Sequence, residues 1–152
     1  MQSLQGESIR SDSFRGRNLV LIFYRGNWCP LCSAQISELA AQYRDLQATN
    51  TEVILVSSQP LGHIQRLADK FSVPIWFLHD ENNTAAEQLG IKSRFGTPLG
   101  MQVLGYGNDT ALPTVIITDT KGRILFVDQT DNYRVRPEPE LFLQVLHKHE
   151  VL

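Results

Sequence analysis

Residues 19–32, which read LVLIFYRGNWCPLC, join a strand pattern to a helix pattern and indicate the fold class. The first six residues form an uninterrupted, partly β-branched apolar run, which is typical of a strand buried on both faces. From residue 30 onward, apolar side chains recur at helical spacing, which predicts one amphipathic helix over about residues 30–48. The two cysteines therefore lie at the junction between a buried strand and the helix that follows it.

The rest of the chain continues this alternation of strands and helices. The predicted strands cover residues 19–24, 52–56, 75–78, 114–118 and 123–127. The predicted helices cover residues 30–48, 61–71, 83–89 and 138–148. Thr84 and Glu87 form a capping-box pattern at the start of the third helix, and the glycine-rich residues 92–112 predict a long loop. The order β-α-β-α-β-α-loop-β-β-α predicts an α/β fold with a central mixed β-sheet flanked by helices.

Length and composition are those of an ordinary globular chain. The 152 residues are 42% hydrophobic and 20% charged, so we expect residues 1–152 to form a single soluble domain. The 14 basic and 16 acidic residues are interspersed, which argues against a nucleic-acid-binding protein. The longest apolar run, residues 19–24, is far shorter than the roughly 20 residues of a membrane helix, so no membrane partner is expected. No signal-peptide pattern opens the chain, so a cytoplasmic location is the default expectation.

The Cys29-Pro30-Leu31-Cys32 segment carries the chemistry. Proline suits the first position of a helix, so Pro30 makes Cys29 the N-cap residue and places Cys32 one turn on, facing the same side. The positive end of the helix dipole favours a thiolate there. Arg25, four residues before Cys29, would add a further positive charge. The pair is predicted to cycle between dithiol and disulfide with little backbone movement.

Two other roles for the cysteines compete with this one. Buried structural thiols would need no particular position, whereas ligands reach the strand-to-helix junctions of a parallel sheet. A zinc site would need more ligands, but the chain has no second Cys-x-x-Cys, and the rings of His147 and His149 would diverge on a helix. Glycine-rich nucleotide-binding motifs are also absent from the sequence. No metal, flavin or nucleotide cofactor is therefore expected.

The long loop and the strand after it add candidate site residues. Proline is awkward inside a central strand, so Pro113 is expected at the beginning of the strand of residues 114–118. Phe95, Met101 and Tyr106 lie in the loop and are candidates for one wall of a substrate site.

These segments resemble the thioredoxin superfamily and, within it, the peroxiredoxin-like (AhpC/TSA, redoxin) group. The resemblance rests on the pattern FYRGNWCPLC, on Leu112-Pro113-Thr114 with the following hairpin, and on residues 131–138, which include Tyr133 and Arg134. It covers nearly the whole chain and implies a thioredoxin-like fold. In that fold Pro113 would take the cis-proline position facing the cysteines.

The sequence departs from true peroxiredoxins at the motif itself. Their pattern is P-x-x-x-T-x-x-C, so with Cys32 in the peroxidatic position Arg25 stands where proline is expected and Cys29 where threonine is expected. The arginine that the family has before the later strand is replaced by the Leu112-Pro113 segment. Two assignments remain open: Cys29 attacks and Cys32 resolves, as in thioredoxin, or Cys32 attacks a peroxide and Cys29 condenses with the sulfenic acid.

The sequence therefore predicts a thiol oxidoreductase that reduces peroxides or protein disulfides through a Cys29–Cys32 couple. Trp28, Pro113 and Arg25 are the candidate substrate-binding residues, with Trp28 expected to flank the sulfur or to pack in the core. An external dithiol reductant, thioredoxin-like or glutathione, would restore the dithiol. The alternatives are a periplasmic thioredoxin-like reductase with a specific client, and a non-enzymatic redox sensor or binding module.

Overall fold

The central sheet is built around the strand that carries the cysteine motif. A computed structural model of the chain describes residues 1–129 and 139–150. The strands of its larger sheet, in spatial order, are β3 (Trp76–His79), β2 (Thr51–Ser57), β1 (Asn18–Phe23), β6 (Thr114–Thr118) and β7 (Ile124–Gln129). The first three are parallel, and β6 and β7 run antiparallel to their neighbours. This mixed sheet, with β1 at its centre, confirms the predicted fold class.

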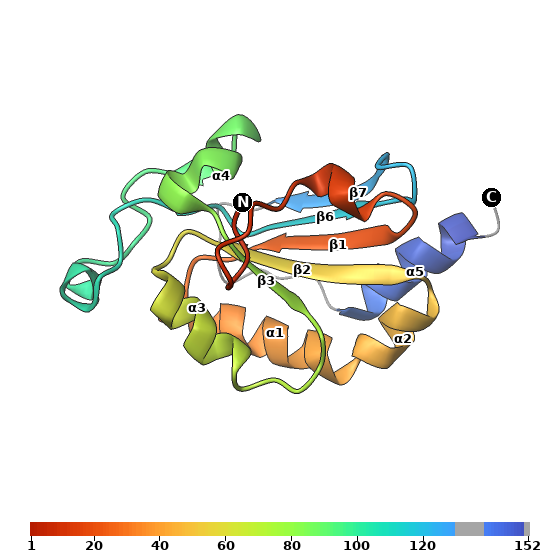
Figure 1. Ribbon diagram of the computed structural model, residues 1–152, viewed down its shortest axis with the longest axis horizontal. Coiled ribbons are helices and arrows are strands. Elements are labelled where there is room, and N and C mark those ends of the chain that lie inside the picture. Colours follow the sequence, from red (N-terminus) through yellow and green to blue (C-terminus); the bar gives the residue numbers. More distant parts are fainter. Residues whose placement is uncertain (130–138, 151–152) are drawn as a thin grey trace.

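Helices cover both faces of the sheet (Figure 1). One face packs against α1 (Pro30–Ala41), α2 (Tyr43–Ala48), α3 (Leu61–Ala68) and α5 (Pro139–Glu150). The core on that face contains Ile22, Ile36, Leu55, Ile64 and Phe142, each at most 1% exposed. The other face is covered by α4 (Thr84–Gln88) and by the N-terminal segment with its 3₁₀ turn η1 (Ser11–Phe14). None of the described helices is long and apolar enough to cross a membrane.

The predicted helix over residues 30–48 is two helices, so that expectation is corrected. The chain leaves helical geometry at Gln42, with φ −101° and ψ 10°, between α1 and α2. Leu39, Tyr43 and Leu46 on either side of the break are all buried in the same core. The apolar spacing therefore continues through the break, which explains why the pattern read as one helix.

The start of α4 is capped by a residue outside the predicted capping box of Thr84 and Glu87. The carboxylate of Asp80 accepts hydrogen bonds from the backbone N–H groups of Ala85 at 2.8 Å and Ala86 at 2.9 Å. The intervening 3₁₀ turn η2 (Glu81–Asn83) positions this carboxylate in front of the helix. A buried aspartate therefore accepts two of the N–H groups that the start of a helix leaves without a partner inside the helix.

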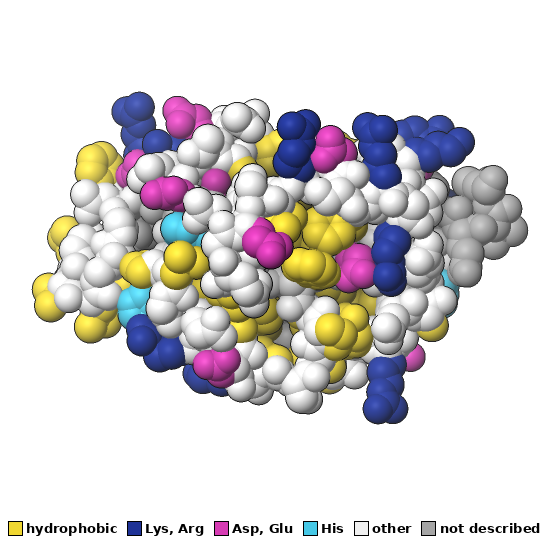
Figure 2. Space-filling view, in the orientation of Figure 1, with side chains coloured by type: hydrophobic (Ala, Val, Ile, Leu, Met, Phe, Trp, Pro, Cys, Tyr) yellow, Lys and Arg dark blue, Asp and Glu magenta, His cyan; other side chains and the backbone are white. Residues whose placement is uncertain are grey.

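The predicted long loop contains secondary structure of its own. Short strands β4 (Lys92–Ser93) and β5 (Thr110–Ala111) pair antiparallel at its base, and the 3₁₀ turn η3 (Met101–Leu104) lies between them. We call residues 94–109 the projecting segment, because they extend from the body at the left of Figure 1. Apolar side chains are exposed at that end in Figure 2, and the segment contributes Leu99 at 97% and Val103 at 89% exposure.

Candidate active site

Both cysteines lie in the first turn of α1, as the sequence predicts. Cys29 is the N-cap residue, with φ −94° and ψ 107°, and a proline opens the helix directly after it. Cys32 follows within the same turn. The two residues form no disulfide and are only 1% exposed, and they share the core cluster that also contains Tyr24 and Ile36. The fold therefore places a buried dithiol at the carboxyl end of its central strand.

Arg25 and Trp28 form one unit beside the dithiol. The guanidinium carbon of Arg25 lies 4.5 Å from the centre of the Trp28 ring, which is cation–π geometry. Arg25 Nη2 also donates a hydrogen bond to the carbonyl oxygen of Gly96 in the projecting segment. Trp28 is half-buried and packs against the cysteine-containing cluster. Arg25 thus joins the projecting segment to the residue that precedes Cys29.

Gly26 lets the Trp28 indole pack against the backbone. A Cβ atom at residue 26 would lie 2.7 Å from Trp28 Nε1 and 3.3 Å from Gln59 Oε1. The first distance is well inside van der Waals contact, so any side chain at this position would displace the indole. The glycine is required by the close approach of these two side chains.

Gln59 organises the turn before the cysteines, and this role was not predicted from the sequence. It is 2% exposed, and its Oε1 accepts the backbone N–H of Asn27 at 2.9 Å. Its Nε2 donates to Asn27 Oδ1 at 2.9 Å and to the Tyr24 hydroxyl at 3.1 Å. Asn27 Nδ2 in turn donates to the carbonyl oxygen of His63 at 2.7 Å. The only available signal was the position of Gln59 just past β2, at the edge where the parallel strands end.

The Tyr24 hydroxyl is a buried phenol in the core cluster that also contains the cysteines. Burial raises the pKa of Tyr24 well above its usual range, while hydrogen bonds from Gln59 and Ser57 act in the opposite direction. The charge of a Cys32 thiolate raises the pKa further. Tyr24 therefore keeps its proton at neutral pH.

Pro113 is buried directly before β6, where the sequence places it. The β1–β6 register pairs Phe23 with Thr114, so Pro113 lies beside the end of β1 where Tyr24 begins the turn to the cysteines. Among the described residues no peptide bond is cis, which corrects the expected cis-proline. The preceding residue, Leu112, donates its N–H to the carbonyl oxygen of Ile91 at 2.7 Å, so the chain enters β6 directly from the β4–β5 ladder.

The other candidates of the long loop are separated by the structure. Tyr106 is 8% exposed and stacks on His63, with ring centres 4.5 Å apart. His63 Nε2 lies 2.8 Å from the carbonyl oxygen of Leu104, so this histidine anchors the projecting segment on α3. Phe95 is 77% exposed, and Met101 is half-buried. The motif residues 131–138 lie outside the described residues.

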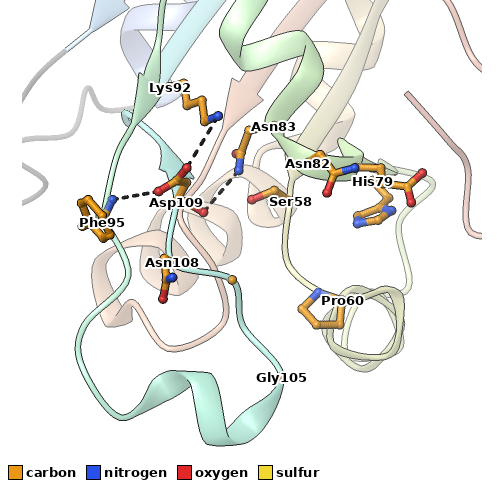
Figure 3. A pocket seen from close by; sticks show the side chains of 12 residues that line it. Ser58, Pro60, His79, Asn82, Asn83, Lys92, Phe95, Gly105, Asn108 and Asp109 are labelled. Carbon is orange, nitrogen blue, oxygen red and sulfur yellow. Dashed lines mark hydrogen bonds and ion pairs between the residues drawn. The ribbon is translucent and has the colours of Figure 1, made fainter.

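A cavity of about 640 Å³ lies next to this region (Figure 3). It is lined by Ser58 and Pro60 after β2, by His79 at the end of β3, and by the base of the projecting segment. Asp109 organises that base, because its carboxylate meets Lys92 Nζ at 3.6 Å and accepts the Phe95 N–H at 3.0 Å. Neither cysteine is among its lining residues. Within the described residues no group of three or more His, Cys, Asp and Glu side chains could hold a metal ion.

Comparison with known proteins gives the chain's relatives. The model of the AhpC/TSA family matches residues 1–127. Peroxiredoxin Q, chloroplastic, of Triticum aestivum is 28% identical over 103 residues, which are 67% of this chain and 48% of that protein. The putative peroxiredoxin bcp of Coxiella burnetii is 27% identical over 95 residues, which are 60% of this chain and 63% of that protein. The match therefore spans about half to two thirds of the length of these relatives.

A solved structure agrees with the fold. The crystal structure of peroxidoxin BcpB from Mycobacterium tuberculosis superimposes with a TM-score of 0.78 at 18% identity, covering 98% of this chain and 91% of that one. At this identity the likeness concerns the fold, and it confirms the thioredoxin-like architecture expected from the sequence.

Proposed function

The chain belongs to the AhpC/TSA family, and we propose that it is a thiol peroxidase with Cys29 and Cys32 as its redox couple. The observation that carries this proposal is the placement of two cysteines, not joined by a disulfide, at the N-cap and in the first turn of α1, soon after the central strand. Two cysteines so placed can close an internal disulfide while the helix stays formed. The names of the wheat and Coxiella relatives, both peroxiredoxins, support the same activity.

The reaction proceeds in three balanced steps. The Cys32 thiolate attacks one peroxide oxygen and breaks the O–O bond, which gives Cys32 sulfenic acid and an alkoxide or hydroxide that leaves, protonated, as alcohol or water. The Cys29 thiol then forms the S–S bond and displaces the sulfenic oxygen as water. An external reductant, either a thioredoxin-like dithiol or two molecules of glutathione, returns two electrons and two protons and leaves as a disulfide.

The family motif favours Cys32 as the attacking sulfur. The family pattern P-x-x-x-T-x-x-C puts its reactive cysteine at this position, and Cys29 then stands in the place of the threonine. Cys29, at the N-cap, is placed to condense with the sulfenic acid.

The burial of the dithiol favours a peroxide over a protein disulfide as the substrate. Both sulfur-bearing residues are 1% exposed. A small peroxide needs only a narrow opening to reach Cys32, whereas a disulfide of a folded protein brings two polypeptide segments with it. Arg25 and Trp28, partly exposed beside the dithiol, are the proposed entrance.

The proposal is tested by trapping the intermediate with dimedone, which adds to sulfenic acids. After one equivalent of hydrogen peroxide, Cys29→Ser should carry the adduct on Cys32, and mass spectrometry of peptides locates it. The wild-type protein should instead form the Cys29–Cys32 disulfide, and Cys32→Ser should form no adduct. If Cys32→Ser carried the adduct on Cys29 and Cys29→Ser carried none on Cys32, Cys29 would be the attacking sulfur and Cys32 the resolving one.

A further inference from the structure

The projecting segment ends in an uncharged, apolar surface. Residues 95–108 contain no Asp, Glu, Lys, Arg or His. The three most exposed large apolar side chains among the described residues all lie here: Leu99 at 97%, Val103 at 89% and Phe95 at 77%. Leu104, at 58%, adjoins them. We call residues 95–104 the apolar tip, and Figure 1 shows that it extends away from the body of the molecule. Exposed apolar side chains gathered in this way indicate an interaction site.

Polar groups of the projecting segment pair with one another. In the 3₁₀ turn η3, the N–H of Val103 donates to the carbonyl oxygen of Gly100 at 3.3 Å, and the N–H of Gly105 donates to that of Gln102 at 3.0 Å. The side chain of Gln102 folds back onto the segment. Its Oε1 accepts the N–H of Gly100 at 3.0 Å, and its Nε2 donates to Asn108 Oδ1 at 3.1 Å. The turn therefore directs apolar side chains outward and pairs polar groups inward.

This arrangement suits a lipid surface better than a protein partner. A protein interface surrounds its apolar centre with polar groups that bond to the partner. The hydrocarbon of a bilayer offers no hydrogen bonds, so a backbone that enters it must have its polar groups paired already. The apolar tip meets this second condition. It is also a projecting surface, which enters a lipid layer without needing a matching groove (Figure 1).

Basic side chains lie at the base of the projecting segment. Arg94 is exposed at its start. Arg66 Nη2 donates to Nδ1 of His63, the histidine that anchors the segment on α3. The acidic group at the same base, the carboxylate of Asp109, is paired with Lys92 Nζ at 3.6 Å. An apolar surface with arginines at its edge matches the boundary between acyl chains and anionic headgroups.

We propose that the apolar tip inserts into the surface of a lipid bilayer, and that Arg94 and Arg66 then face anionic headgroups. Such a surface contact needs no spanning helix. It therefore revises the expectation that the protein has no membrane partner, which rested on the length of the apolar runs alone. Arg25 donates to the carbonyl oxygen of Gly96 and lies against Trp28, so the inserted end is joined to the turn before the cysteines. The contact goes beyond the peroxidase activity and does not depend on it.

The test is flotation of the full chain with vesicles of phosphatidylcholine, alone or mixed with phosphatidylglycerol. The wild-type protein should float with the vesicles, and more of it with the mixed ones. Leu99→Ser combined with Val103→Ser should lower the partition coefficient about tenfold or more, because both side chains would lose contact with the acyl chains. Both are exposed, so the fold should not change. Ile124→Ser, at a 63%-exposed position on β7, is the matched control and should bind like the wild type.

The role of the arginines is tested separately. Arg94→Gln should lower binding to the mixed vesicles by about fivefold and leave binding to phosphatidylcholine unchanged, because only the anionic lipid attracts its charge. The difference between the two vesicle types should also shrink in high salt. Equal binding of Arg94→Gln and wild-type protein to the mixed vesicles would overturn the role of Arg94.

A tryptophan at the tip reports insertion directly. In Leu99→Trp the added indole should shift its emission to shorter wavelength on vesicles and be quenched by brominated acyl chains, measured as the difference from the wild-type protein. Ile124→Trp should show neither effect.

Other outcomes would overturn the proposal. Wild-type protein that floats with neither vesicle, or a Leu99→Ser/Val103→Ser variant that floats as well as the wild type, would contradict insertion of the tip. If the protein did not float but formed a dimer that this variant dissociates, the apolar tip would instead contact a second copy of the chain. None of these measurements uses a peroxide, so their failure leaves the proposed peroxidase untouched.

Discussion

Asn27 and Gln59 hold each other through two hydrogen bonds of 2.9 Å, one from the Asn27 backbone N–H to Gln59 Oε1 and one from Gln59 Nε2 to Asn27 Oδ1. The pair joins the turn before Cys29 to the segment after β2, two parts of the chain that are 32 residues apart. This clamp, rather than the cysteine motif alone, fixes the path of the chain into α1.

Asn27→Ala should therefore destabilise the protein. The substitution leaves Gln59 Nε2 and the carbonyl oxygen of His63 without a hydrogen bond that the native chain supplies. Unsatisfied groups of this kind cost on the order of 1–3 kcal/mol each, so the free energy of unfolding in urea should fall by about 2 kcal/mol or more. Asn108→Ala, at an exposed position, is the control and should change it by less than about 0.5 kcal/mol. Equal effects of the two variants would contradict the role of the clamp.

Gly26→Ala should displace the indole of Trp28. The added Cβ would meet Trp28 Nε1 at 2.7 Å, so the ring must move and the fluorescence of Trp28 should change. Overpacking of this kind costs about 1–3 kcal/mol. Gly62→Ala is the matched control, because a Cβ there meets only the end of Arg66 at 3.9 Å, and stability should stay the same or rise. An unchanged spectrum in Gly26→Ala would show that the indole does not pack as described.

Asp80→Ala should loosen α4. The substitution removes the acceptor for two helix N–H groups, and loss of such a cap costs about 1–2 kcal/mol. Hydrogen exchange of the Ala85 and Ala86 amides should accelerate along with the fall in stability. Asp12→Ala is the control: it removes an exposed ion pair with Arg10 and should have little effect on the exchange of these amides or on the stability of the protein. Protected amides in Asp80→Ala would mean that another group caps the helix.

The predictable part of the fold follows from local patterns. The strand before the cysteines, the position of Cys29 at the helix start and the hairpin at 114–127 all depend on neighbouring residues, and the structure confirms them. The break at Gln42 could not be predicted, because Leu39 and Tyr43 stay on one buried side through it.

In the candidate site, too, residues next to the motif could be predicted from the sequence, and residues brought in from distant segments could not. Arg25, Trp28 and Pro113 were predicted because they adjoin the motif or open a strand, and the structure brings them to the same end of the sheet, while their role in binding a substrate stays a prediction. Gln59 could not be found in this way, since its partners lie 32 and 35 residues away and no local pattern encodes that distance. The capping role of Asp80 was not predicted for a different reason: it depends on the tight turn of residues 81–83, which brings the carboxylate in front of the helix.

Alkaline pH should reveal the buried phenol of Tyr24. Burial raises the pKa of Tyr24, so between about pH 10, where an unfolded tyrosine ionises, and its higher folded value only the unfolded state loses the proton. The free energy of unfolding should therefore be unaffected below about pH 10 and should fall above it, by at most about 1.4 kcal/mol per pH unit from this group. Tyr24→Phe should show a shallower fall than the wild-type protein. Identical slopes would contradict the burial of the phenol.

The most direct test of the account is the rate at which the reduced protein reacts with hydrogen peroxide, followed by stopped-flow fluorescence. A Trp76→Phe background leaves Trp28 as the only indole, and this ring packs against the cluster that contains both cysteines. The rate constant should be far above that of free cysteine, and it should be kept in Cys29→Ser and lost in Cys32→Ser. A rate no faster than that of free cysteine would contradict the peroxidase and would leave thioredoxin-like disulfide exchange as the activity of the dithiol.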